Sequence, residues 1–194
     1  MIKKVLMLAS MILAATLTLG LIGCGDAGGE AETKAPVILY INQMNEGDQY
    51  QASVLTGGTA YQEDEIIIDL GNYAINPNID LTSFYMDVIC KGYEVSYFRK
   101  DTGTRVPATF TGSLNTIVPV NNTVSTSIII CRASQKQMPP LEDLCLYGYD
   151  QETGLTEIHT TCRVVVWGET FAGEEVVTDP GHLTVNFACT WTSI

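Results

Sequence analysis

Residues 181–191 read Gly-His-Leu-Thr-Val-Asn-Phe-Ala-Cys-Thr-Trp, and this stretch decides the fold. Apolar side chains recur at every second position from Leu183 to Trp191, with mostly small or polar residues between them. A period of two places alternate side chains on opposite faces of an extended chain, which is typical of a half-buried β-strand. The stretch therefore predicts a strand with one face in a core.

The same alternation recurs upstream at Ile158–Val166 and, less regularly, at Tyr93–Tyr97. Shorter apolar runs lie between turn-forming residues such as Asn45-Glu-Gly-Asp48 and Asp179-Pro-Gly181. Asp101-Thr-Gly103 and Ala172-Gly-Glu174 are expected to form hairpin connections. About eight or nine short strands over residues 37–194 predict an all-β fold, an antiparallel β-sandwich. The only helix expected is a short turn over Pro139–Leu144.

Composition agrees with a packed domain and restricts its partners. Of the 194 residues, 46% are hydrophobic and 16% charged, so the chain can form a core and is not of the disordered class. Its formal net charge is −12, which argues against nucleic acid as a partner because binding phosphate requires a surface of Lys and Arg.

The N-terminal residues have the pattern of an export signal. Lys3 and Lys4 precede an apolar run, and Leu21-Ile22-Gly23-Cys24 closes it. This arrangement resembles the lipobox of bacterial lipoproteins, with the less usual Ile at the second position. The resemblance implies a signal peptide over residues 1–23, cleavage before Cys24, acylation of the Cys24 sulfur, and attachment to a membrane. A plain secretory signal and an uncleaved membrane helix are the alternatives.

Residues 24–36 then form the lipidated Cys and a flexible linker of Gly, Ala, Glu and Pro, and the β-sandwich domain covers residues 37–194. Removing residues 1–23 takes away Lys3 and Lys4 and no acid, which leaves a net charge of −14. Anionic head groups would repel that charge, so the lipid and not the protein surface is expected to hold the chain at the membrane. An Asp directly after the Cys would resemble the signal that retains lipoproteins in the inner membrane of some bacteria. Gly25 stands at that position instead, which favours the outer membrane.

The order of segments in the second half resembles uncharacterised small bacterial lipoproteins with an immunoglobulin-like sandwich. The residues that carry this resemblance are Tyr93–Arg99, Ile128–Arg132, Gln135-Lys136, Pro139–Leu141, Val164–Gly168, Ala172-Gly173 and Leu183–Phe187. It implies fold and envelope location only. The Cys pair around a core Trp that marks true immunoglobulin domains is not matched, because Trp167 and Trp191 lie too near the C-terminal end.

Five cysteines remain if Cys24 carries lipid, so at least one thiol is unpaired within the chain. An oxidising envelope permits disulfides, and Cys145 is the preferred bridge residue, with Cys131 or Cys162 as its partner across about 15 residues. The alternative is that all five are small buried apolar residues. No Cys-x-x-Cys pair is present, and no metal or other cofactor is predicted.

Catalytic chemistry finds little support, and no catalytic residue is predicted. His159 is expected on a solvent-facing strand position, and His182 beside a turn. Asp101-Thr-Gly103 matches the aspartic protease tripeptide, but a single copy among basic residues indicates a polar turn. Acidic groups at 63–65 and at Asp150, Glu152 and Glu157 match no calcium loop pattern, which leaves solvated loops and a Ca²⁺ site both open.

Three functions remain at this stage. The first is a membrane-anchored, non-catalytic accessory or interaction module of the cell envelope, with a protein partner. The second is a surface glycan-binding or adhesive module that uses Tyr147 and Tyr149, whose rings can stack or bind, although ordinary strand aromatics at the edge of the core are the favoured interpretation of these residues. The third and least supported is an envelope hydrolase, which needs His159 or His182 beside a carboxylate and a nucleophile.

Overall fold

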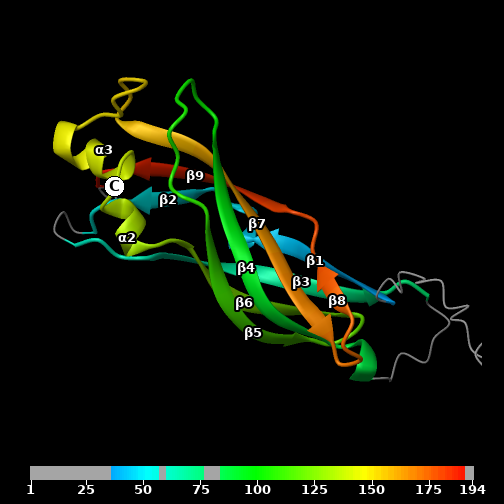
Figure 1. Cartoon of the computed structure of the whole chain (residues 1–194). Coiled ribbons are helices and arrows are strands. Elements are labelled where there is room, and N and C mark those ends of the chain that lie inside the picture. The colour runs from blue at the N-terminus through cyan, green and yellow to red at the C-terminus, as the bar shows by residue number, and fades with distance from the viewer. Residues whose placement is uncertain (1–35, 57–59, 77–83, 191–194) are drawn as a thin grey trace, which may run out of the picture. The chain divides into compact units, whose positions relative to one another are not determined.

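The alternating segments of the sequence form strands in the computed structural model, which describes residues 36–56, 60–76 and 84–190 (Figure 1). The strands within these ranges are β1 Val37–Met44, β2 Tyr50–Ser53, β3 Asp64–Ala74, β4 Val88–Arg99, β5 Phe110–Val118, β6 Asn122–Cys131, β7 Glu157–Thr170, β8 Glu175–Val177 and β9 Gly181–Ala188. The short helices are η1 Asn45–Gly47, η2 Phe84–Met86, α2 Ala133–Lys136 and α3 Leu141–Tyr147.

The strands form two sheets, which confirms the predicted β-sandwich. One sheet has the order β1-β3-β6, and the other has the order β2-β9-β7-β4-β5 with β8 paired to β7. Both sheets lie within one compact unit. The sequence therefore predicted the architecture correctly, although not which strand joins which sheet.

The core lies on the faces that the alternation identified. Every second residue of β7, from Ile158 to Val166, is buried, and the residues between them are only partly covered. Leu183, Val185 and Phe187 of β9 are buried in the same way. In β4 the Tyr97 ring meets Phe187 edge-on at 5.7 Å between centroids, and its hydroxyl donates to the Ile130 carbonyl oxygen of the other sheet. The two sheets are thus joined by apolar packing and by a buried hydrogen bond.

One part of the antiparallel prediction is wrong, because β2 pairs with β9 in parallel. At η1 the chain leaves the first sheet without reversing, so β1 and β2 run in the same direction as β9 (Figure 1). Asn45, Glu46 and Gly47 all have positive φ there, and the Asn45 side chain donates to the Asp48 carbonyl oxygen at 3.0 Å. The predicted turn at these residues therefore exists, but it moves the chain between sheets instead of closing a hairpin.

Strand β4 runs from one end of the sandwich to the other. The two ends are called the η2 end and the α3 end, after the helices beside them. Val88, its first residue, follows η2, and Arg99, its last, contacts the segment after α3. Twelve residues of strand span roughly 40 Å. Strand β1 begins at the η2 end, because the Ile75 N–H donates to the Pro36 carbonyl oxygen at 2.8 Å and the side chain of Asn72, near the end of β3, donates to the Met86 carbonyl oxygen of η2 at 2.9 Å. The chain before Pro36 is thus joined to the η2 end, and α3 lies at the opposite end (Figure 1).

Candidate functional site

Helix α3 overlaps the turn predicted over Pro139–Leu144, but it begins two residues later, at Leu141, and ends three residues later, at Tyr147. Its first turn carries Glu142 and Asp143, whose charge suits the positive end of a helix. Leu141 and Leu144 are buried against the sandwich and fix one face of the helix. Gly148 ends the helix with φ 80°, a left-handed conformation that glycine adopts without the penalty of a Cβ atom. The chain leaves α3 in a sharp turn at the surface.

A disulfide ties α3 to the sandwich, but not to the predicted partner. Cys145 is bridged to Cys189, the residue that follows β9, across a sequence separation of 44. Cys145 was therefore the correct bridge residue, whereas Cys131 and Cys162 as its partners were wrong. Both are buried free thiols, as is Cys90, because each lies on an inward-facing strand position where its side chain fills the core. Burial raises the pKa of Cys90 and Cys162 to about 12.

Arg99 organises the loops at the α3 end. Its guanidinium side chain is 3% exposed and donates to Asp101 Oδ1 at 2.7 Å, to Asp150 Oδ2 at 2.9 Å and to the Arg105 carbonyl oxygen at 3.0 Å. The loop 100–109 and the turn 148–155 are therefore held by one side chain. Asp101-Thr-Gly103 is a polar turn as predicted, but β4 and β5 are joined by this longer connection instead of a tight hairpin.

The carboxylates around Arg99 and Arg105 are held in their charged form. Burial alone would raise the pKa of Asp150, but hydrogen bonds from Arg99 and Thr153 outweigh burial and lower it. The pKa of Asp101 is lowered for the same reason, by Arg99 and by the N–H groups of Gly103 and His159. Glu152 accepts from the N–H groups of Arg105 at 2.8 Å and Thr104 at 2.7 Å, which lowers its pKa.

The predicted acidic loop is thus a set of ion pairs and not a set of free ligands. Asp150 and Glu152 are engaged by basic side chains and backbone N–H groups, which leaves neither carboxylate available as a simple solvated anion. Among residues 36–56, 60–76 and 84–190, no group of three or more His, Cys, Asp or Glu side chains is placed to hold a metal ion.

The turn braced by Arg99 exposes apolar side chains. We define the α3-end patch as Leu146, Tyr147, Tyr149 and Leu155, which are 65%, 53%, 48% and 45% exposed. The Asp150 N–H donates to the Leu155 carbonyl oxygen at 2.7 Å, so the two arms of the turn lie together. Tyr147 and Tyr149, the predicted binding residues, therefore lie on a surface held by a disulfide on one side and by Arg99 on the other. Large apolar side chains on such a surface are typical of a binding site.

A second buried ion pair lies beneath α2, and no sequence pattern signalled it. Lys136 is 1% exposed, and its ammonium group donates to Asp64 Oδ1 at 2.8 Å and to the Ser53 carbonyl oxygen at 2.6 Å. Burial raises the pKa of Asp64 despite the hydrogen bonds from Lys136 and Tyr50. This pair joins α2 to β2 and β3, and it lies inside the fold where it holds elements together.

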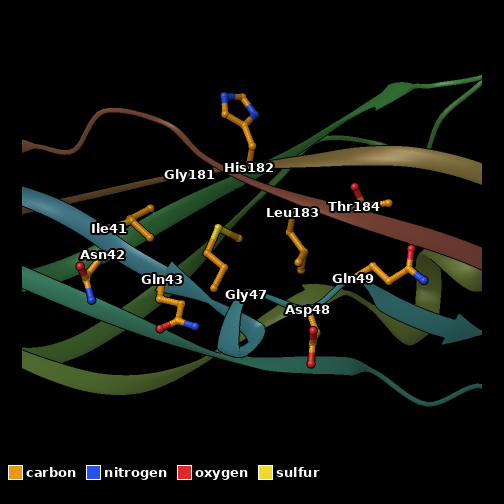
Figure 2. Close-up of a pocket in the computed structure, with 11 residues that line it drawn as sticks. Ile41, Asn42, Gln43, Gly47, Asp48, Gln49, Gly181, His182, Leu183 and Thr184 are labelled. Carbon is orange, nitrogen blue, oxygen red and sulfur yellow. The ribbon is translucent and has the colours of Figure 1, made fainter.

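A surface pocket of about 500 Å³ lies between β1, η1 and the start of β9 (Figure 2). The amides of Asn42, Gln43 and Gln49 and the carboxylate of Asp48 give it a polar side, while Leu183 points into it from β9. The His182 ring points away from these side chains, on the other side of the β9 ribbon (Figure 2). His182 and Asp48 are therefore not arranged as an acid–base pair.

The other histidine has structural partners. His159 Nδ1 lies 2.9 Å from Asn186 Oδ1, and its Nε2 lies 3.8 Å from Glu157 Oε2. Its side chain is 41% exposed, in agreement with the predicted solvent-facing position. Within the described ranges, no hydrogen bond joins either histidine side chain to a Ser, Thr or Cys side chain.

The lipobox residues Leu21, Ile22, Gly23 and Cys24 lie outside the described residues. In the residues that the structure does describe, no helix has the length and apolar character needed to cross a membrane. No family model matches the chain, and no curated protein matches it.

Proposed function

We propose that this chain is a lipid-anchored, non-catalytic interaction module of the bacterial cell envelope, held in the outer membrane by acyl chains on Cys24. The lipobox supports the anchor, since Leu21-Ile22-Gly23-Cys24 ends a signal-like segment at the expected distance from Met1. Two or three acyl chains, at about 0.8 kcal/mol per buried CH₂, give a stable attachment. We propose no cofactor for this module.

The single observation that carries the interaction function is the position of the α3-end patch. The chain before Pro36 joins the η2 end of the sandwich, whereas the patch lies at the opposite end of β4 (Figure 1). An anchor that precedes Pro36 would therefore leave Leu146, Tyr147, Tyr149 and Leu155 free to meet another envelope molecule. The brace at Arg99 and Cys145 reduces the conformational entropy that binding would otherwise cost.

A protein partner fits this patch better than a glycan. Glycan sites stack a sugar on an aromatic ring that is flanked by polar groups, whereas the segment that carries the two tyrosines here also exposes the aliphatic side chains of Leu146 and Leu155. Mixed aromatic and aliphatic surface of this kind is typical of the centre of a protein–protein interface. A glycan-binding or adhesive module is the second candidate, and the exposed rings of Tyr147 and Tyr149 favour it.

The anchor is tested by replacing one residue. In cells given radiolabelled palmitate, the wild-type chain is expected to take up label and to partition into the detergent phase of Triton X-114. Cys24→Ser should abolish the label, because it removes the sulfur that accepts the diglyceride. The matched control is Cys145→Ser, which leaves Leu21–Cys24 intact and should keep the label. Equal labelling of the Cys24→Ser chain would contradict the anchor.

The patch is tested by site-specific photocrosslinking in intact cells. With benzoylphenylalanine at position 147 we expect a discrete protein adduct, because the side chain is exposed on a braced surface. The same probe at Lys91, half-exposed in an ion pair on β4, is the control and should give none. Tyr149→Ala should weaken the adduct at position 147 without changing the melting temperature, since exposed side chains contribute little to stability. Binding to a glycan array that is lost on Tyr147→Ala, with no protein adduct, would instead support the second candidate.

A further inference from the structure

A second set of exposed apolar side chains lies at the η2 end. Phe84 and Tyr85 of η2 are 57% and 56% exposed, and Phe171, in the turn after β7, is 42% exposed. The Phe84 ring lies 4.1 Å from the Tyr85 ring and 6.2 Å from the Phe171 ring, centroid to centroid. The three rings form one aromatic cluster, held in place because the Phe171 N–H donates to the Asp87 carbonyl oxygen at 3.1 Å.

An apolar groove belongs to the same end. Ile38, Ile75 and Val177 are 39%, 51% and 63% exposed, and they line a groove of about 400 Å³ between β1 and β8. Ile75 is the residue whose N–H bonds to the Pro36 carbonyl oxygen, so the groove begins where β1 begins. We name the aromatic cluster and these three side chains together the η2-end surface.

The chain enters the sandwich at Pro36, at the same end as this surface, and this position indicates what covers the surface. Cys24 lies twelve residues before Pro36, and a chain of that length reaches at most about 40 Å even when fully extended. If Cys24 carries lipid, as proposed above, the η2 end is therefore the end of the sandwich to which the anchor is joined, within about 40 Å of the bilayer. Phe, Tyr and aliphatic side chains are the groups that enter the interface between head groups and acyl chains.

We propose that the η2-end surface docks on the membrane, with Phe84, Tyr85 and Phe171 inserted into the interfacial layer of a zwitterionic bilayer. This inference rests on the proposed anchor. The charge of the mature chain, −14, explains why the contact is apolar and why neutral rather than anionic lipid is its partner. The docked orientation directs the α3-end patch away from the bilayer, so the anchor and the aromatic cluster together set the direction in which the module faces.

The test places a fluorescent probe at each end of the same anchored protein. The full-length lipidated chain is reconstituted into phosphatidylcholine vesicles with or without brominated acyl chains, and binding is checked by flotation. The additional emission of a Phe84→Trp variant is expected to fall to about half or less in brominated vesicles, because an indole at the interface lies within reach of the bromine atoms. Tyr147→Trp, the matched control at the α3 end, should be unaffected. The emission of the unmodified chain is subtracted from both.

The possible results separate the docking from the anchor. Flotation with equal, weak quenching of the Phe84→Trp and Tyr147→Trp variants would overturn the docking and leave the anchor intact. Failure of the wild-type chain to float would overturn both. If a second copy of the chain covered the η2-end surface, the Phe84→Trp emission would stay unquenched and dimers would be seen after detergent extraction, and that result too would overturn the docking. Loss of quenching when Phe171→Ser is added to Phe84→Trp would confirm that the rings act together.

Discussion

Replacing Arg99 by Met is expected to lower the free energy of unfolding by about 3–5 kcal/mol, the usual cost of removing one partner of a buried ion pair. Asp150 is fully buried, and its Oδ1 atom has no hydrogen-bond partner within the described structure, so Arg99 supplies the compensating charge. The melting temperature should fall by about 10 °C or more, measured by circular dichroism or calorimetry.

Two variants control this prediction. Lys91→Met breaks an ion pair with Glu169 in which the two side chains are 52% and 35% exposed, and it should cost less than about 1 kcal/mol. Adding Asp150→Asn to Arg99→Met should restore part of the stability, since it removes the unpaired charge. Equal losses from Arg99→Met and Lys91→Met would show that the network does not hold the α3 end.

Acid provides a second readout of the same network. The pKa values of Asp101 and Asp150 are lower in the folded chain than their ordinary value of about 4. Their contribution is therefore complete at neutral pH and is lost as the pH falls from about 4 through the folded-state pKa values. The wild-type stability should decline over that range, and the decline should be smaller in Arg99→Met, where the low pKa of Asp150 has lost its main cause.

Removing the Cys145–Cys189 disulfide is expected to cost about 4 kcal/mol of unfolding free energy. Its sequence separation of 44 sets the loop-closure entropy that the bridge takes from the unfolded chain. The Cys145→Ala/Cys189→Ala variant should melt well below the wild type. Dithiothreitol should lower the melting temperature of the wild type towards that of the variant, and should leave the variant itself unchanged.

The bridge also predicts which thiols react. Alkylation of the unfolded but unreduced chain should modify Cys90, Cys131 and Cys162 and spare Cys145 and Cys189. In the native chain the three free thiols should resist alkylation, because each side chain is buried. Protection of Cys131 or Cys162 in the unfolded, unreduced chain, read by peptide mapping, would contradict the connectivity.

Much of this fold could be predicted from contiguous residues. Alternation over Ile158–Val166 and Leu183–Phe187 identified both strands and their buried faces. Pro139-Pro140 and the acids that follow located α3, and Ala172-Gly-Glu174 located the β7–β8 hairpin. Tyr147 and Tyr149 were singled out as binding residues from their place near an acidic turn, and both are exposed, but the residue types alone favoured aromatics at the edge of the core. The alternation of a strand and the residue types of a turn involve only a few neighbouring residues, so one short segment of sequence is enough to recognise them.

Only the tertiary structure decided which distant residues meet. Cys145 pairs with Cys189 and not with Cys131 or Cys162, because α3 lies against the end of β9 while the other two cysteines point into the core. Arg99 meets Asp150 across 51 positions, and Lys136 meets Asp64 across 72. Such pairs depend on the order of strands in each sheet and on the crossing at η1. No local pattern encodes that order, because many arrangements bury the same alternating faces equally well.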